Sequence, residues 1–154
     1  MTDDKLRSEL QAEYFYLQKV IEDFDSCAIA IKAWSITFSL TAIGGAFASK
    51  AHFVFLIASV SALMFWILEA VWKSFQTGYY QGSEAIERYF NGSGTLTAPF
   101  QIGDTWFQHW SAGGNRQWVK MMLWPHVALP HAVVVVIGGL LFAYSVLSQV
   151  GHSG

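Results

Sequence analysis

Residues 28–72 decide the fold of this chain. They read AIAIKAWSITFSLTAIGGAFAS (28–49), then KAH (50–52), then FVFLIASVSALMFWILEAVW (53–72). At 1.5 Å per helical residue, the first apolar segment covers about 33 Å and the second about 30 Å, which is enough to cross the hydrocarbon core of a bilayer. Because so few residues separate them, the two segments are predicted to form a tight transmembrane helical hairpin, which we place at residues 28–72.

The composition of the 154-residue chain indicates the same class. Hydrophobic residues make up 53% and charged residues only 13%, against about a quarter charged in ordinary soluble proteins. The net charge of −2 argues against nucleic-acid binding, which needs a basic surface. The single cysteine, Cys27, excludes an internal disulfide. The polar N-terminus lacks the features of a signal peptide, so we expect the first apolar segment to be retained as an anchor.

Residues 1–27 are predicted to form an amphipathic cytoplasmic helix, whose start Asp3 and Asp4 favour through the helix dipole. Apolar residues recur along it at spacings of four and three, which is a heptad stripe. The stripe predicts either packing on the protein's own helices or a short coiled coil between subunits. Its members are Leu10, Tyr14, Leu17, Ile21 and Phe24.

Residues 73–122 are predicted to form a cytoplasmic and interfacial region. Its first part continues the preceding helix but is weakened by Gly78 and Gly82. Residues 91–115, rich in glycine and aromatic residues, are predicted to be a loop, and residues 116–124 a short lead-in helix. We expect the loop's aromatic side chains to lie on the lipid headgroups. They are Trp106, Phe107 and Trp110.

A third transmembrane helix is predicted at residues 123–148, followed by a short tail at 149–154. The distribution of lysine and arginine sets the orientation, because these residues are enriched in cytoplasmic segments. Eight of the nine precede or open the first span or lie between the second and third spans, and only Lys50 lies in the hairpin tip. We therefore expect a multi-pass membrane protein, with the N-terminus in the cytoplasm and the C-terminus outside.

The most informative charged residues are Lys32 and Glu69, which lie equally far from the hairpin tip. They should therefore share one membrane depth, where a lone charge is costly and a paired one much less so. We predict an ion pair, with Lys73 as a competitor one turn beyond Glu69. The pair would either fix the register of the hairpin, or form a charged ring at the inner mouth of an oligomeric pore or part of a proton path.

Small residues form stripes on both helices of the hairpin, as expected where membrane helices approach closely. The predicted role is packing within the hairpin, although the surplus of small and hydroxyl residues also fits contacts between subunits or a weakly polar pore lining. The packing candidates are Ser35, Ser39, Ala42 and Ala46 on the first span, and Ala58 and Ala62 on the second.

Two histidines, His126 and His131, mark the entry to the third span. Five residues apart, they lie about 140° apart on a straight helix, which is poor geometry for binding one metal ion or haem. Pro130 removes a backbone donor between them and predicts a kink. We interpret both as interfacial residues at a broken helix, with a cofactor or proton-relay role as the alternative, in which His109 would be a third participant.

Motifs of common enzyme classes are absent from the sequence, including phosphate-binding loops, nucleophile elbows and zinc-protease signatures. We therefore predict no catalytic residue, no metal site and no cofactor.

The segment ILEAVWKSFQTGYYQGSEAIERYF (67–90) follows the hairpin. This layout resembles small bacterial multi-span membrane proteins, which implies a location in the bacterial inner (cytoplasmic) membrane. It is also loosely similar, over residues 1–90 and in architecture only, to the SLATT group of two-span effectors from bacterial conflict systems. That resemblance implies a helical hairpin that builds a pore or disrupts the membrane. The third span and the aromatic loop depart from the two-span pattern.

Together these patterns predict an all-α integral membrane protein with three transmembrane helices and amphipathic cytoplasmic helices. Three spans enclose little space, so we expect self-association into a homo-oligomer in the lipid bilayer that forms an ion channel or a membrane-permeabilising pore. The alternative is a non-catalytic accessory or scaffold subunit of a larger membrane complex, which would contact a cytoplasmic protein partner through residues 73–122.

Overall fold

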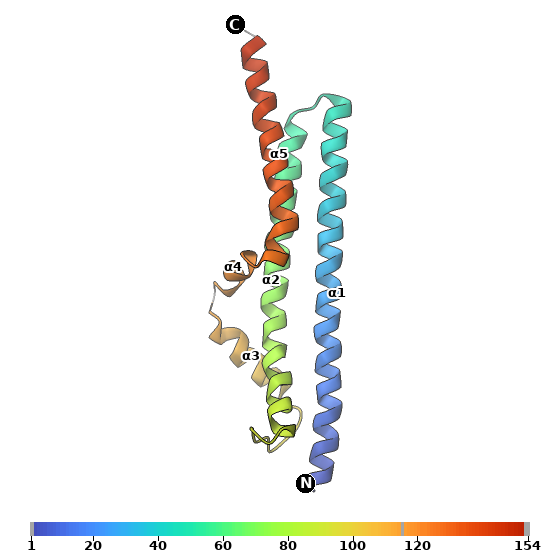
Figure 1. Cartoon of the computed structure of the whole chain (residues 1–154), viewed down its shortest axis with the longest axis vertical. Coiled ribbons are helices and arrows are strands. Elements are labelled where there is room, and N and C mark those ends of the chain that lie inside the picture. The colour runs from blue at the N-terminus through green and yellow to red at the C-terminus, as the bar shows by residue number, and fades with distance from the viewer. Residues whose placement is uncertain (1, 115, 153–154) are drawn as a thin grey trace. The chain divides into compact units, whose positions relative to one another are not determined.

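The computed structural model describes residues 2–114 and 116–152, and five helices account for most of them (Figure 1). They are α1 (Asp3–Ser49), α2 (Phe53–Phe90), α3 (Ile102–Ala112), α4 (Gln117–Met122) and α5 (Pro125–His152). No strand occurs in the described ranges. Three of the helices, α1, α2 and α5, are long and apolar enough to cross a membrane. The predicted all-α class and its three apolar helices are therefore confirmed.

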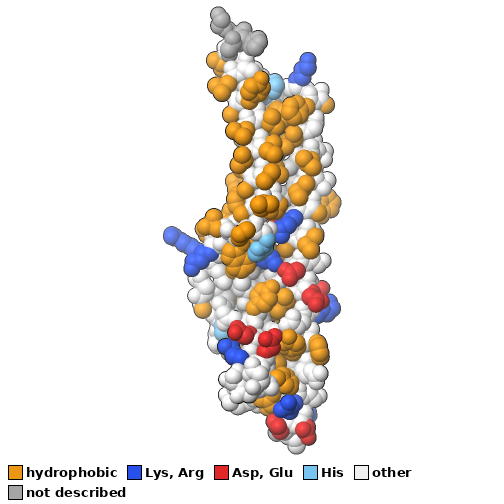
Figure 2. Space-filling model, viewed as in Figure 1, with side chains coloured by type: hydrophobic (Ala, Val, Ile, Leu, Met, Phe, Trp, Pro, Cys, Tyr) orange, Lys and Arg blue, Asp and Glu red, His pale blue; other side chains and the backbone are white. Residues whose placement is uncertain are grey.

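The chain folds as two compact units, each built from segments distant in sequence. We call residues 28–70 and 119–154 the apolar unit, and residues 1–27 and 71–118 the polar unit. On the face shown in Figure 2, hydrophobic side chains predominate over the apolar unit, whereas all the acidic side chains in view lie on the polar unit. This difference is the one expected between a lipid-facing and a water-facing surface.

Small residues allow the three helices of the apolar unit to pack closely. Ala46, Ala58 and Ala62 are buried. Gly138 of α5 lies so close to α2 that an added Cβ would stand 2.3 Å from Ser59 Oγ. The Ser59 hydroxyl lies 3.3 Å from the backbone carbonyl oxygen of Val135, to which it donates. At the hairpin tip, Lys50 adopts a left-handed conformation (φ 55°), which ends α1 and reverses the chain.

In the polar unit, the heptad stripe packs on α2 of the same chain. Leu10 and Leu17 form a buried cluster with Ile86, so the stripe is covered within the protomer. The Tyr14 hydroxyl donates a 2.9 Å hydrogen bond to the Glu87 carboxylate, and this bond raises the pKa of Tyr14. Of the two roles expected for the stripe, these contacts correspond to packing on the protein's own helices.

The long helices differ from prediction at their boundaries. The expected division at residue 27 is not a helix boundary, since α1 runs unbroken from Asp3 to Ser49. No glycine or proline lies between residues 3 and 43 to interrupt it. Helix α2 continues through Gly78 and Gly82 to Phe90. The third apolar helix covers Pro125–His152 rather than 123–148, and it passes through Pro130.

The predicted loop at residues 91–115 contains a helix, α3, and its aromatic side chains do not all lie outward. Trp106 packs over Gly78, where an added Cβ would stand 2.5 Å from its ring. Its indole nitrogen donates to the Phe75 carbonyl oxygen at 3.0 Å, and its ring stacks on Trp110. Trp106 and Trp110 are one helical turn apart, so together they give α3 an aromatic face that packs on α2. Phe107 remains exposed.

Candidate functional site

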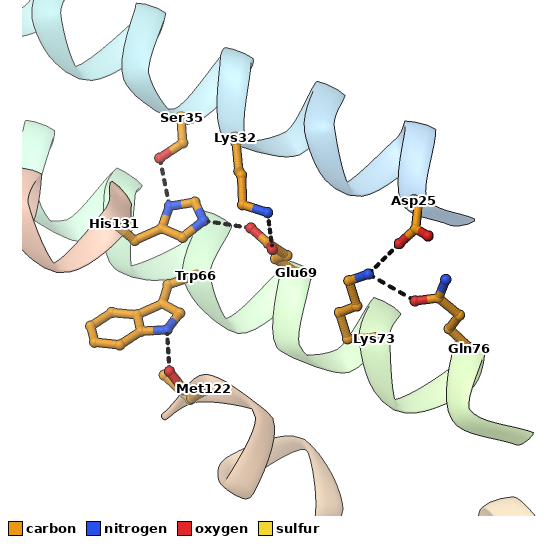
Figure 3. A network of polar contacts seen from close by, with 9 residues as sticks. All are labelled: Asp25, Lys32, Ser35, Trp66, Glu69, Lys73, Gln76, Met122 and His131. Atoms are coloured by element: carbon orange, nitrogen blue, oxygen red, sulfur yellow. Dashed lines mark hydrogen bonds and ion pairs between the residues drawn. The ribbon is translucent and has the colours of Figure 1, made fainter. Parts of the chain in front are cut away.

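A cluster of polar side chains lies inside the apolar unit, where three helices meet (Figure 3). Helix α1 contributes Lys32 and Ser35, which are three residues apart and therefore on one face. Helix α2 contributes Glu69, and α5 contributes His131. Ser35, Glu69 and His131 are fully buried, whereas the Lys32 side chain is 24% exposed.

Glu69 stands at the centre of this cluster, because each of its carboxylate oxygens has its own partner. Lys32 Nζ lies 2.7 Å from Oε1, in ion-pair contact but without hydrogen-bond alignment. His131 Nε2 lies 3.0 Å from Oε2. On its other side, the His131 ring places Nδ1 2.9 Å from Ser35 Oγ. The order of contacts is therefore Lys32, Glu69, His131, Ser35.

These contacts assign the hydrogens of the neutral imidazole. A carboxylate paired with an ammonium ion only accepts hydrogen bonds, so Nε2 of His131 carries the hydrogen and donates it to Glu69. Nδ1 then accepts from the Ser35 hydroxyl. With a neutral imidazole, the ammonium of Lys32 and the carboxylate of Glu69 balance each other. That balance suits an apolar surrounding, where an uncompensated charge costs several kcal/mol or more.

Lys73 belongs to the polar unit, where it makes an ion pair with Asp25. It also donates a 2.9 Å hydrogen bond to the side-chain carbonyl of Gln76, whose amide nitrogen in turn donates to the Ile21 carbonyl oxygen at 2.9 Å. The structure thus brings Lys32 and Glu69 together and gives the predicted competitor, Lys73, a different carboxylate.

The two histidines of the WPHVALPH stretch have different surroundings. His126 is exposed and its ring lies 5.4 Å from that of Trp124, as expected of a boundary residue. His131, unlike His126, is fully buried, and its interpretation as an interfacial residue at a broken helix stays a prediction. His109 lies in α3, in the polar unit.

The predicted packing residues lie on the inner faces of the hairpin. Ser35, Ser39, Ala46, Ala58 and Ala62 are buried, and Ala42 is partly buried. Ser39 lies one turn beyond Ser35, and its fully buried hydroxyl has no hydrogen-bond partner among the described residues.

Sequence reasoning missed that His131 and Ser35 complete the Lys32–Glu69 pair. The sequence carried one usable signal, which was the expected depth of each residue in the membrane. His131 follows the start of its helix by six residues and Lys32 follows the start of the first span by four, and both segments enter from the same predicted side. Residues at similar depth on three adjacent helices can meet.

The order Ser35, His131, Glu69 matches that of a serine-hydrolase triad, but the setting does not support hydrolysis. A triad serine must reach substrate, and an oxyanion needs backbone N–H donors that are free. Ser35 is fully buried and lies within α1, where backbone N–H groups bond to carbonyl oxygens of the preceding turn. A cluster of three or more histidine, cysteine or acidic side chains suited to a metal ion is also absent from the described residues.

Comparisons with protein-family models, curated proteins and solved structures find no match to this chain. The resemblance to the SLATT group stays a prediction.

Proposed function

We propose that the chain is a membrane protein whose copies associate through the outer face of α1 and enclose an ion-conducting pore. The observation that carries this proposal is a second stripe of small residues on α1, which we call the outer stripe. Its members are all exposed and recur at spacings of three and four. They are Ala30, Ala33, Thr37, Thr41, Gly44 and Ala48.

Helical geometry places the outer stripe opposite the buried one. Successive residues turn by about 100°, so residues nine positions apart lie about 180° apart. Thr37 lies nine positions from both Ala28 and Ala46, which are buried against the rest of the apolar unit. The outer stripe therefore faces away from the helices of its own protomer.

The outer stripe differs from the other outward surfaces of the apolar unit. Those carry large apolar side chains such as Met64, Val136 and Leu140, which are at least half exposed and suit contact with lipid. The outer stripe, by contrast, carries only alanine, threonine and glycine side chains. In membranes, small residues at this spacing let helix backbones approach closely, so a second copy of α1 fits this face better than lipid does.

A pore between copies of α1 would be weakly polar, because the Thr37 and Thr41 hydroxyls would line it. Lys32 and Glu69 lie on the inner side of the protomer, so this arrangement does not use them as a charged ring at the pore mouth. The lysine and arginine distribution supports a cytoplasmic polar unit and an external C-terminus.

Filling the outer stripe tests the proposal. We expect Thr37→Leu and Gly44→Leu to dissociate the oligomer in mild detergent and to reduce ion flux into liposomes at least tenfold. Val136→Leu enlarges a lipid-facing side chain on α5 and should leave both unchanged. Cross-linking and light scattering give the oligomeric state. A strict monomer of the unaltered protein would refute the proposal.

A second candidate function, a non-catalytic accessory subunit, is favoured by exposed aromatic side chains on the polar unit. Phe15, Tyr16, Phe100 and Phe107 are each more than half exposed, and aromatic residues are enriched in protein interfaces. A monomer that conducts no ions but binds a protein partner, with affinity that falls in Phe15→Ala and Phe100→Ala, would support this alternative.

A further inference from the structure

We propose that Glu69, His131 and Lys32 form a proton-binding site inside the apolar unit, in which one buried carboxylate exchanges its Lys32 partner for a protonated His131. The site lies within a single protomer, so it does not depend on the proposed pore. Its ligand is a proton, and the residue that takes it up is His131.

The proton would enter at Nδ1 of the imidazole. In the neutral ring, this nitrogen accepts from Ser35 Oγ at 2.9 Å, while Nε2 donates to Glu69. After uptake both ring nitrogens carry hydrogens. The Ser35 hydroxyl must then rotate, so that its oxygen accepts from Nδ1 and its hydrogen turns to a carbonyl of the preceding helical turn.

Proton uptake would leave two cations, Lys32 and His131, beside the single carboxylate of Glu69. The more deeply buried cation keeps the contact with the carboxylate. His131 and Glu69 are fully buried, whereas the Lys32 side chain is 24% exposed. A lysine has a long flexible stem that can carry its ammonium toward the membrane surface. Lys32 therefore leaves Glu69 when His131 becomes charged, and the buried pair stays neutral in total.

The charge state of His131 depends on the polar groups that surround its ring. Facing it are the Glu69 carboxylate from α2 and the Ser35 hydroxyl from α1, with the Lys32 ammonium on the far side of Glu69. The nearest titratable side chain on α5 is His126, which is exposed, and α4 carries Lys120, which is also exposed.

The test uses the full-length protein in lipid bilayers with nitrogen-15-labelled histidine. Solid-state NMR distinguishes the two neutral tautomers of an imidazole from the cation. We expect the signal lost in His131→Gln to report a neutral ring with hydrogen on Nε2 at pH 8, and a cation at pH 5. His126→Gln, the matched control, should remove a different signal and leave this transition unchanged.

Two variants should change the protonation of His131 in opposite directions. In Glu69→Gln, we expect His131 to stay neutral down to pH 5, because no carboxylate compensates the cation. In Lys32→Met, we expect His131 to be cationic already at pH 8, because Glu69 then has no other counter-ion.

A neutral His131 at both pH values in the unaltered protein would overturn the proposal, as would the same charge state of His131 in both variants. Ser35→Ala serves as a milder variant where another fails to fold, as judged by circular dichroism. It should alter the NMR signal of neutral His131 and leave that of His126 unchanged, and an unaltered His131 signal would refute the assigned contact. Because the spectra report on one protomer, absence of ion flux would refute the pore without affecting this result.

Discussion

Replacing Gly138 by alanine tests how closely α2 and α5 pack. The added methyl group would lie 2.3 Å from Ser59 Oγ and 3.0 Å from the carbonyl oxygen of Phe55. The serine hydroxyl can rotate away, but the carbonyl belongs to the backbone of α2. The two helices must therefore move apart by a few tenths of an ångström.

The neighbouring glycine, Gly139, provides the control, because no atom lies within 4 Å of its Cβ position. Alanine is favoured over glycine inside a helix by about 0.8–1.0 kcal/mol, and this gain applies at both positions. Overpacking costs about 1–3 kcal/mol, and it applies only at Gly138. We therefore expect Gly138→Ala to be less stable than Gly139→Ala by about 1–3 kcal/mol, or roughly 5- to 150-fold in the unfolding equilibrium.

The measurement is reversible unfolding by sodium dodecyl sulfate in mixed micelles, followed by circular dichroism. The double substitution Ser59→Ala with Gly138→Ala should recover part of the loss, since it removes the contact with the hydroxyl but not the contact with the carbonyl. Equal stability of the two single glycine variants would refute close packing of α5 on α2 at this level.

Two further comparisons probe the polar unit by denaturation. Gly78→Ala would put a methyl group 2.5 Å from the Trp106 ring, whereas Gly82→Ala meets only an ordinary contact at 3.4 Å. Both variants gain the helix propensity of alanine, so we expect Gly78→Ala to be less stable than Gly82→Ala by about 1–3 kcal/mol and to alter tryptophan fluorescence. Equal stabilities would contradict the contact. Lys73→Met removes a buried ammonium from its hydrogen bonds and should cost about 1–3 kcal/mol. Lys19→Met breaks an exposed ion pair that solvent screens, so it should lose less stability than Lys73→Met. The reverse order of the two losses would argue against the Lys73 contacts.

The long apolar helices were predictable because hydrophobic length is a strong local signal. The residues at which these helices begin and end were harder to predict. The composition changes near Cys27 from polar to apolar, but this change marks a different surrounding and not a break in backbone hydrogen bonding. A helix ends where its backbone loses partners, and the residues around position 27 include no glycine or proline to cause that.

The glycines in the second half of α2 suggested a weakened helix, because their effect on packing cannot be read from the local sequence. Gly78 lowers helix propensity, but it also leaves space for the Trp106 ring. That contact joins residues 28 positions apart, and no local pattern reveals it. The same contact explains why a segment rich in glycine contains α3, since packing of its aromatic face stabilises a short helix.

The pairing of Lys32 with Glu69 followed from counting residues outward from the hairpin tip, which fixes register when the connection is short. The position of His131 depends on how α5 docks against the hairpin, and the long connection before α5 carries no register information. Its role in the cluster therefore could not be obtained from periodicity.

The order of the cluster residues along the chain also determines when the cluster can be completed during synthesis. Lys32, Ser35 and Glu69 are made early and can enter a bilayer together as a hairpin whose two charges compensate each other. His131 is made 62 residues after Glu69, so until α5 docks, one oxygen of Glu69 and the hydroxyl of Ser35 lack the imidazole between them. The hairpin alone therefore lacks these two polar contacts, and docking of α5 supplies both of them through one side chain, His131.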